Sequence, residues 1–304
     1  MITLIRVSCF WIVFMLVSDQ AAVPAQAPIK VYILAGQSNM YGVGGSPADL
    51  PPGLRNWMDT MKEGQAGCVL FYYRDGLNAT LTHHVETHVL LNPNSGHSYG
   101  PELSFARSLS DYHREQIAVI KYAWGAVQLA MGDNSFYPGD WDGSAFAHEG
   151  TRFADMLDTI DNGLDDLKSR GYIPEIKGFV WMQGESDSLA PVWAQSYGHN
   201  LEKLIRRIRR TYGLLPFVYG QIHRSYIGDQ DLFYHVDTVR QGQTWVLDHV
   251  TMVGMLDTAS NISFWPKPLS DKEPTYCRIH FNGPGLLTLG QEFAAIMKRF
   301  VPAR

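Results

Sequence analysis

Short, nearly continuous apolar runs recur along the chain and alternate with segments of helical periodicity. Five of the runs are rich in β-branched residues and have the length of strands buried on both faces, which is typical of a parallel sheet. Five other segments carry apolar residues at helical spacing. The expected strands are residues 29–35, 117–123, 176–182, 217–222 and 251–256, and the expected helices are residues 101–114, 151–170, 192–212, 236–249 and 285–300.

The alternation of strands and helices predicts right-handed βαβ units. Such units build a three-layer α/β/α sandwich, here with a five-stranded parallel sheet. No repeat, low-complexity tract or linker divides residues 28–304, so we expect a single domain there. Two loop-rich insertions, residues 42–100 and 131–149, are expected at the carboxyl ends of the strands, where sheets of this kind build binding sites.

The first 27 residues differ from the rest of the chain. Arg6 precedes an apolar run over residues 7–17, and small residues follow it. The run is too short to span a bilayer, which needs about 20 residues. We interpret residues 1–27 as a signal peptide, cleaved preferably after Ala25 and alternatively after Ala27. A membrane anchor or a buried strand is the competing interpretation. The mature protein is then expected to be secreted or periplasmic, with no membrane span.

Composition narrows the function classes. The chain is 45% hydrophobic, 12% aromatic and 18% charged, which excludes a disordered protein. A net charge of −5 argues against a nucleic-acid partner. Export would remove Cys9 and leave Cys68 and Cys277 in an oxidising compartment. Whether these two cysteines form a disulfide stays open at this point.

Three segments carry candidate chemistry. Ser38, in Gly-Gln-Ser-Asn-Met, lies at a strand-to-loop switch where an α/β hydrolase can expose a nucleophile; a simple Ser/Asn turn is the alternative. Gln183 and Glu185, in Trp-Met-Gln-Gly-Glu-Ser-Asp, follow another strand. An amide can donate to an oxyanion and a carboxylate can orient a histidine, although Ser186 or Asp187 could simply cap a helix. His280 precedes the last helix and is a candidate general base among 11 histidines.

Together, GQSNM, WMQGESD, IHFNGPG and the Gly-Pro-Glu-x-Ser-Phe-Ala segment at residues 100–106 resemble the SGNH (GDSL-like) hydrolases. The resemblance is to the branch that holds sialate O-acetylesterases and the sixth family of carbohydrate esterases, and it extends from Val31 to Phe293. It implies a flavodoxin-like fold without cofactor or metal. It further implies Ser38 as nucleophile, His280 as base, and an oxyanion hole made by the Ser38 N–H, the Gln183 side chain and the N–H of Gly125.

The chain departs from this branch in two places. Ala126 and Val127 stand where the branch usually has Gly-Gly-Thr, so the backbone donor is Gly125 or Ala126, with Gly100 a weaker candidate. Cys277 stands three residues before His280, where SGNH enzymes usually have aspartate. A cysteine with an ordinary pKa of about 8.5 does not stabilise an imidazolium by charge. Glu185 is the first candidate for the orienting carboxylate; the alternatives are Asp271, Asp257, or a dyad with no carboxylate.

Other signals are weaker. The basic run at residues 206–210 is interpreted as a solvated helix face. Histidines at 83, 84, 88 and 97 fit no strong zinc pattern, so no metal is expected. Four aromatic residues in or beside loops are candidates for stacking on sugar rings, and they are Tyr137, Trp141, Trp193 and Trp265.

These observations favour an exported serine esterase that removes O-acetyl groups from carbohydrate of the xylan or sialate type. A lipase or thioesterase for longer acyl chains is the first alternative, because the same fold and residues would serve it. A non-catalytic carbohydrate-binding relative is the second. The oligomeric state is not predicted.

Overall fold

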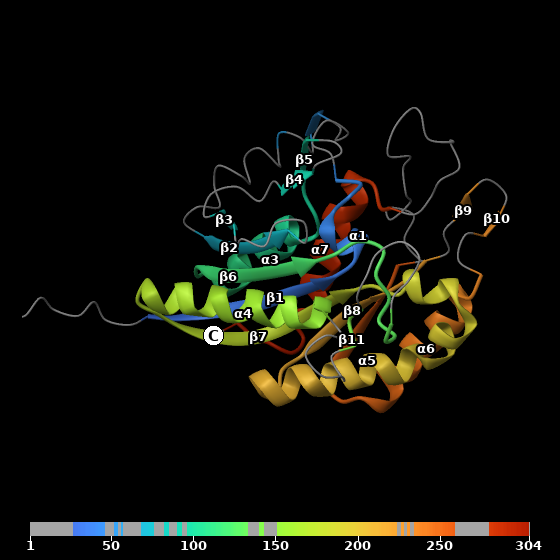
Figure 1. Cartoon of the computed structure of the whole chain (residues 1–304). Helices are drawn as coiled ribbons and strands as arrows, with labels where there is room; N and C mark the ends of the chain where they lie inside the picture. Colours follow the sequence, from blue (N-terminus) through green and yellow to red (C-terminus); the bar gives the residue numbers. More distant parts are fainter. Residues whose placement is uncertain are drawn as a thin grey trace, which may run out of the picture.

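A seven-stranded sheet runs through the middle of the protein, with helices on both of its faces (Figure 1). Its strands are Ala27–Gly36 (β1), Val69–Asp75 (β2), Thr82–His84 (β3), Ile117–Ala123 (β6), Tyr172–Met182 (β7), Phe217–Gln221 (β8) and Val253–Asp257 (β11). The strand order is β11-β8-β7-β1-β6-β2-β3, in which six strands are parallel and β3 is antiparallel to β2. The computed structural model describes residues 27–45, 52–53, 56, 68–75, 82–84, 90–92, 96–132, 140–142, 151–223, 226–227, 230–231, 234–258 and 280–303.

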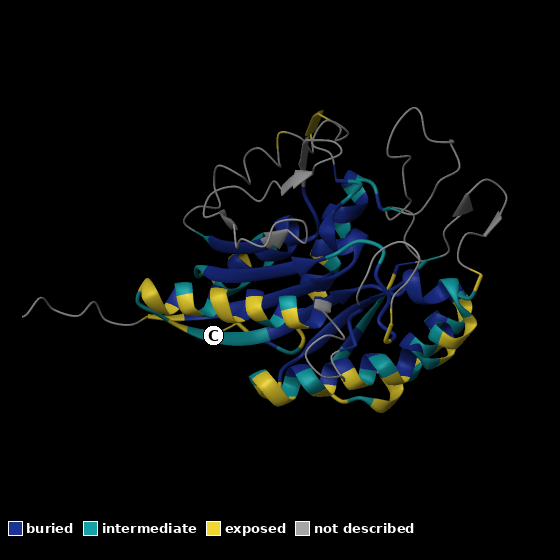
Figure 2. Ribbon diagram, viewed as in Figure 1, coloured by how far each residue is buried: buried dark blue, intermediate teal, exposed yellow. Residues whose placement is uncertain are grey.

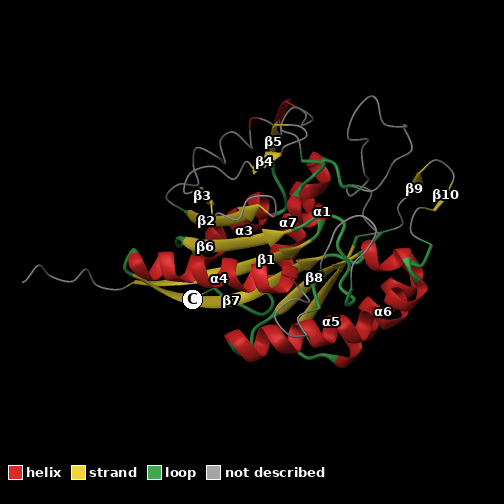
Figure 3. Ribbon diagram, viewed as in Figure 1, coloured by secondary structure: helices red, strands yellow, loops and turns green. Residues whose placement is uncertain are grey.

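The helices cover the sheet in two layers (Figure 3). They are Ser38–Tyr41 (α1), Glu102–His113 (α3), Thr151–Ser169 (α4), Pro191–Tyr212 (α5), Val236–His249 (α6) and Gly283–Met297 (α7), with a short 3₁₀ helix at Ser186–Leu189 (η2). Helices α3 and α7 pack on one face, and α4, α5 and α6 pack on the other (Figure 1). Two small hairpins, Leu90–Asn92 (β4) with Gly96–Ser98 (β5) and Tyr226–Ile227 (β9) with Gln230–Asp231 (β10), complete the described elements.

Burial explains why these segments form these elements. Strand β6 is buried along its whole length, as is β1 from Ile29 onward, whereas the outer helices alternate buried and exposed stripes (Figure 2). On α5 the buried stripe includes Leu201, Leu204, Ile205 and Ile208, as helical spacing predicts. In the part of the chain that the structure describes, no helix combines the length and the hydropathy that crossing a membrane requires.

The predicted α/β/α architecture is confirmed, but the predicted number of strands is wrong. The five expected strands are β1, β6, β7, β8 and β11, and their order is that of a flavodoxin-like sheet. Strand β2 lies inside the segment that was expected to be loop. It pairs with β6 from Val69 opposite Ile117 to Asp75 opposite Ala123. This pairing adds a sixth parallel strand to the sheet, although the apolar run that forms it is short and lies among turn residues.

The topology places a crevice at the carboxyl ends of β1 and β7. The chain passes from β1 to β2 and β6 on one side and later to β7 on the other, and ligands bind at such switch points. Gly36 at the end of β1 has φ of +148°, and a Cβ there would lie 2.0 Å from the Met182 carbonyl oxygen. Only glycine allows this approach, and it brings the residues after β1 directly against those after β7.

Candidate active site

Ser38 opens α1 immediately after β1. Its side chain lies at the carboxyl edge of the sheet, and the residue is 7% exposed. The turn is closed by the Tyr41 N–H donating to Gln37 O at 2.8 Å and the Gly42 N–H donating to Ser38 O at 2.9 Å. The first N–H groups of a helix have no partner within it. The Ser38 N–H is therefore suited to donate to an oxyanion beside its own side chain.

The loop that carries His280 lies against this turn. The side-chain oxygen Oδ1 of Asn39 accepts a hydrogen bond from the Phe281 N–H at 3.0 Å, although the two residues are 242 positions apart. A Cβ on Gly44, in the same turn, would lie 3.6 Å from the Cβ of His280. The residues that follow Ser38 and His280 are thus directly bonded to each other. The structure brings the two predicted catalytic segments together.

His280 is half-buried, and this burial lowers its pKa to about 4. A general base works in its neutral form, which a lowered pKa preserves in acid. We therefore expect kcat/KM for an acetyl ester to stay level down to about pH 5 and to be half-maximal near pH 4. Acetate release followed from about pH 3 to about pH 8 measures this limb. A midpoint near 6.5, the ordinary pKa of histidine, would contradict this view of the His280 surroundings.

The loop after β6 supplies the predicted backbone donor. A Cβ on Gly125 would lie 3.8 Å from the Cβ of Ser38, so Gly125 borders the nucleophile. Ala126 next to it has φ of 56°, a left-handed conformation that costs a non-glycine residue about 1–2 kcal/mol. Ala126, which departs from the Gly-Gly-Thr pattern, therefore has a backbone conformation that glycine would adopt without strain.

Gln183 and Asp187 are hydrogen-bonded to the loop that follows β6. The Gln183 Nε2 donates to Val127 O at 3.1 Å and to Asp187 Oδ2 at 2.6 Å. Asp187 also accepts the N–H of Leu129 at 2.7 Å and of Ala130 at 3.0 Å. Both N–H bonds of the Gln183 amide are engaged in this way, so the structure does not aim it at Ser38 as the predicted oxyanion donor.

Asp187 belongs to the same Gln-Gly-Glu-Ser-Asp segment as Gln183 and Glu185, a segment whose carboxylates were expected to face the crevice beside Ser38. Its role in holding another loop was not predicted. Burial raises its pKa to about 7, against the three N–H groups that favour the carboxylate. Only the fold shows that its partners lie on the loop after another strand.

Glu185 is 1% exposed but is not hydrogen-bonded to His280. Its Oε1 accepts from Asn39 Nδ2 at 2.7 Å, and its Oε2 has no hydrogen-bond partner among the described residues. Burial raises the pKa of this carboxyl. Asp257, another candidate, is half-exposed and forms an ion pair with Arg240 at 3.4 Å. Asp271 and Cys277 lie outside the described residues.

A buried ion pair supports the nucleophile turn. Lys121 on β6 donates to Glu102 Oε2 at 2.5 Å and to the carbonyl oxygen of Tyr41 at 3.1 Å. Glu102 accepts the Gly100 N–H at 2.8 Å with its other oxygen. Neither charged side chain is exposed. The end of α1 is therefore anchored to β6 through Lys121, a role that the apolar pattern of β6 did not reveal.

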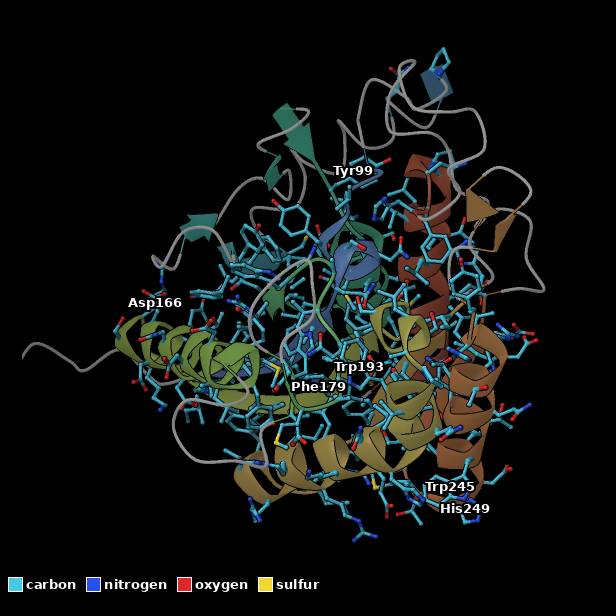
Figure 4. All side chains as sticks on the ribbon, turned by 45° about the vertical axis from the view of Figure 1, so that its right-hand side comes forward. Tyr99, Asp166, Phe179, Trp193, Trp245 and His249 are labelled. Carbon is cyan, nitrogen blue, oxygen red and sulfur yellow. The ribbon has the colours of Figure 1, made fainter. Side chains whose placement is uncertain are left out.

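The structure describes two of the four aromatic candidates, Trp141 and Trp193. Trp141, one of the four candidates for stacking on a sugar, is instead fully buried and packs against Trp181 with ring centroids 5.1 Å apart. Trp193 is half-buried near the start of α5 (Figure 4). Tyr137 and Trp265 lie outside the described residues.

Trp245 and His249, which the sequence analysis did not single out, stack on α6 with ring centroids 4.4 Å apart, far from Tyr99, which borders the nucleophile turn (Figure 4). The described residues hold no group of three or more potential metal ligands. Cys68 is a free thiol in the described structure. The side chains at 83, 84, 88 and 97 lie outside the description.

A serine thus follows the first strand of this doubly wound sheet, and a histidine lies just before its last helix. Residues 28–299 match the family model "Carbohydrate esterase, sialic acid-specific acetylesterase". The chain belongs to this family of carbohydrate esterases, and it is thus a carboxylic ester hydrolase.

Relatives of known sequence and structure agree with this assignment. "Probable carbohydrate esterase At4g34215" of Arabidopsis thaliana is 28% identical over 219 residues, which cover 71% of this chain and 75% of that protein. The crystal structure of the Arabidopsis protein AT4G34215 has a TM-score of 0.59 at 22% identity and covers 90% of this chain and 99% of that one. NanS has a TM-score of 0.57 at 17% identity, with 90% and 98% covered. XAC1771, a carbohydrate acetylesterase from Xanthomonas citri, has a TM-score of 0.56 at 18% identity, with 89% and 56% covered. At these identities the structures show the shared fold.

Proposed function

We propose that this protein is an exported serine esterase that removes O-acetyl groups from carbohydrate through an acetyl-serine intermediate. The observation that carries the proposal is the junction of the two catalytic segments: the side chain next to Ser38 is hydrogen-bonded to the backbone next to His280. Gly125 packs on the Cβ of the same serine. These contacts support a site in which a nucleophile, a base and backbone N–H donors act together at the switch point of the sheet.

The chemistry follows from these positions. The Ser38 oxygen attacks the acetyl carbonyl carbon while His280 takes the hydroxyl proton. The N–H groups of Ser38 and of Gly125 or Ala126 stabilise the oxyanion. The bond to the sugar oxygen then breaks, and the sugar oxygen takes the proton from His280. Water, activated by His280, attacks the acetyl-serine, releases acetate and restores the free serine.

The substrate class is tested by acetate release from acetylated xylan and from O-acetylated sialic acid, beside a series of nitrophenyl esters of increasing chain length. We expect turnover of an acetylated sugar and a preference for acetate over longer acyl groups. A maximum beyond butyrate would identify a lipase or thioesterase instead. Sugar binding without turnover, and without fluorophosphonate labelling of Ser38, would identify a non-catalytic relative.

Of the two cleavage positions, the start of β1 favours the one after Ala25. The first residue of β1 is Ala27, which pairs with Tyr172 on β7. Cleavage after Ala25 would leave the whole of β1 in place, whereas cleavage after Ala27 would remove its first residue. N-terminal sequencing of the exported protein checks this. A mature terminus within β1 would contradict the preferred cleavage position.

A further inference from the structure

The side chain of Asn39 connects three segments of the candidate active site. Asn39 follows the nucleophile and is 1% exposed. Its Nδ2 donates to Oε1 of Glu185, after β7, at 2.7 Å. Its Oδ1 accepts from the N–H of Phe281, next to His280, at 3.0 Å. One planar amide thus joins the carboxyl end of β7 to the histidine loop through the nucleophile turn.

The bond to Phe281 controls where His280 lies. The segment from His280 to Asn282 is short and precedes α7, whose first turn is capped by Asn282 accepting the Gly285 N–H at 2.7 Å. The Phe281 N–H donates to the Asn39 side chain. Since Asn39 is adjacent to Ser38, this bond sets the position of the base relative to the nucleophile.

Glu185 determines which way the Asn39 amide faces. An asparagine side chain presents a donor on one side and an acceptor on the other, and the two sides exchange when the amide flips. An ionised carboxylate only accepts hydrogen bonds. With Glu185 on one side, the NH₂ group must face it, and the oxygen is left to face the Phe281 N–H.

We propose that Asn39 is a positioning residue that holds His280 against Ser38, and that Glu185 acts on the histidine through this amide instead of by a hydrogen bond to its ring. The inference rests on the proposed esterase function and deepens it. It explains why Glu185 Oε1 is bonded to Asn39 while Oε2 has no hydrogen-bond partner in the described structure. It also gives a way of holding the base in a chain that has Cys277 where aspartate is usual.

Several titratable groups surround this link. Tyr197 on α5 donates to Gln183 O at 2.7 Å and lies in the field of Glu185 and Asp187. His223, after β8, has its ring 4.9 Å from that of Phe281, and burial lowers its pKa to about 4, as it does for His280. Asp187, with its pKa raised to about 7, is present in every variant below. Comparison with the wild-type profile therefore removes its contribution.

The test replaces Asn39 by aspartate, which keeps an oxygen for the Phe281 N–H. Two adjacent buried carboxyls do not both ionise readily, so in acid they share one proton, and an O–H replaces the lost N–H donor. As the pH rises the proton leaves and repulsion separates the pair. We expect kcat of Asn39→Asp, relative to wild type, to be highest near about pH 5 and to fall at least about tenfold by about pH 8, with a much smaller change in KM.

Exchanging the amide and the carboxylate between positions 39 and 185 should restore the hydrogen bond between them. In Asn39→Asp/Glu185→Gln the new amide at position 185 donates to the new carboxylate at position 39, and only one charge remains. We expect this double variant to lose the alkaline fall of Asn39→Asp. Glu185→Gln alone still offers an oxygen to Asn39 and should retain kcat within about tenfold. Asn200→Asp, on α5 where Asn200 is bonded to Ser196 at 3.2 Å, is the matched control and should follow the wild-type profile.

The outcomes separate the two proposals. A profile of Asn39→Asp parallel to wild type, or a double variant with no recovery, would overturn the positioning role. A loss for Glu185→Gln as large as for the single aspartate variant, without recovery in the double, would show that Glu185 acts on the ring directly. If the wild type hydrolyses no ester, the proposed function fails. In that case the hydrogen bond between positions 39 and 185 is tested by the urea unfolding midpoint. This midpoint should fall as the pH rises for Asn39→Asp and recover in the double variant.

Discussion

Replacing Ser38 by alanine is expected to lower kcat for an acetyl ester by about 10⁵-fold or more. In the proposed mechanism the serine oxygen forms the covalent intermediate, and the neighbouring Asn39 is hydrogen-bonded to the segment that carries His280. Removing the base has a similar cost, because nucleophile and base act as a unit. His280→Ala is therefore expected to match Ser38→Ala, and the double variant should be hardly worse than either. Initial rates with 4-nitrophenyl acetate measure all three.

The matched control for this experiment is Ser196→Ala. Ser196 lies on the outer part of α5 and donates to Val192 O at 2.9 Å, so its loss should leave kcat unchanged. Because Ser38 contributes little packing, Ser38→Ala should also unfold at the wild-type urea concentration. Retention of more than about a hundredth of the wild-type rate by Ser38→Ala would show that another group is the nucleophile.

Replacing Lys121 by methionine is expected to reduce the free energy of unfolding by about 3–5 kcal/mol. The fold would keep the Glu102 carboxylate fully buried with one N–H donor, from Gly100, and without its counter-charge. Burial lowers the pKa of Lys121, while the attraction to Glu102 opposes this shift. Urea unfolding measured at fixed pH, with the slope compared between variants, gives the change.

Two further variants test the cause of that loss. Adding Glu102→Gln removes the uncompensated charge and keeps an acceptor for the Gly100 N–H, so the double variant should regain at least about half of the lost stability. Lys168→Met removes an ion pair with Asp165 whose side chains are 59% and 73% exposed. Its effect should stay within about 0.5 kcal/mol. A loss below about 1 kcal/mol for Lys121→Met would show that water reaches the buried carboxylate.

Elements with a complete local pattern were predicted most closely. The ranges 117–123 and 236–249 agree with β6 and α6 to the residue. Strand β7 was expected to begin at residue 176 and begins at Tyr172 instead. Its first part pairs with the start of β1, Ala27 opposite Tyr172, and includes the polar residues Glu175 and Lys177. Backbone pairing with a neighbour extended this strand beyond its apolar run.

The sequence predicted which segments carry the candidate site residues, but not the contacts that these residues make. Strand ends and motif resemblance brought Ser38, Glu185, Gln183 and His280 to one edge of the sheet. Glu185 was expected beside His280, and its oxygen is bonded to Asn39. Gln183 was expected to face an oxyanion, and its amide is bonded to Val127 and Asp187. Whether each of these hydrogen bonds forms depends on atomic positions at the scale of an ångström, which the spacing of residues along the chain does not determine.

The sequence by itself determined the alternation of strands and helices and the doubly wound architecture; the nucleophile and base segments were predicted from their resemblance to a known family. Periodicity and strand-end chemistry are local properties, so they can be read from the order of residues. Only the tertiary structure decided that Asn39 bonds to Phe281 across 242 residues, that Lys121 and Glu102 pair in the core, and that β2 joins the sheet. These depend on which segments pack together and on hydrogen-bond directions, which form only when the whole chain has folded.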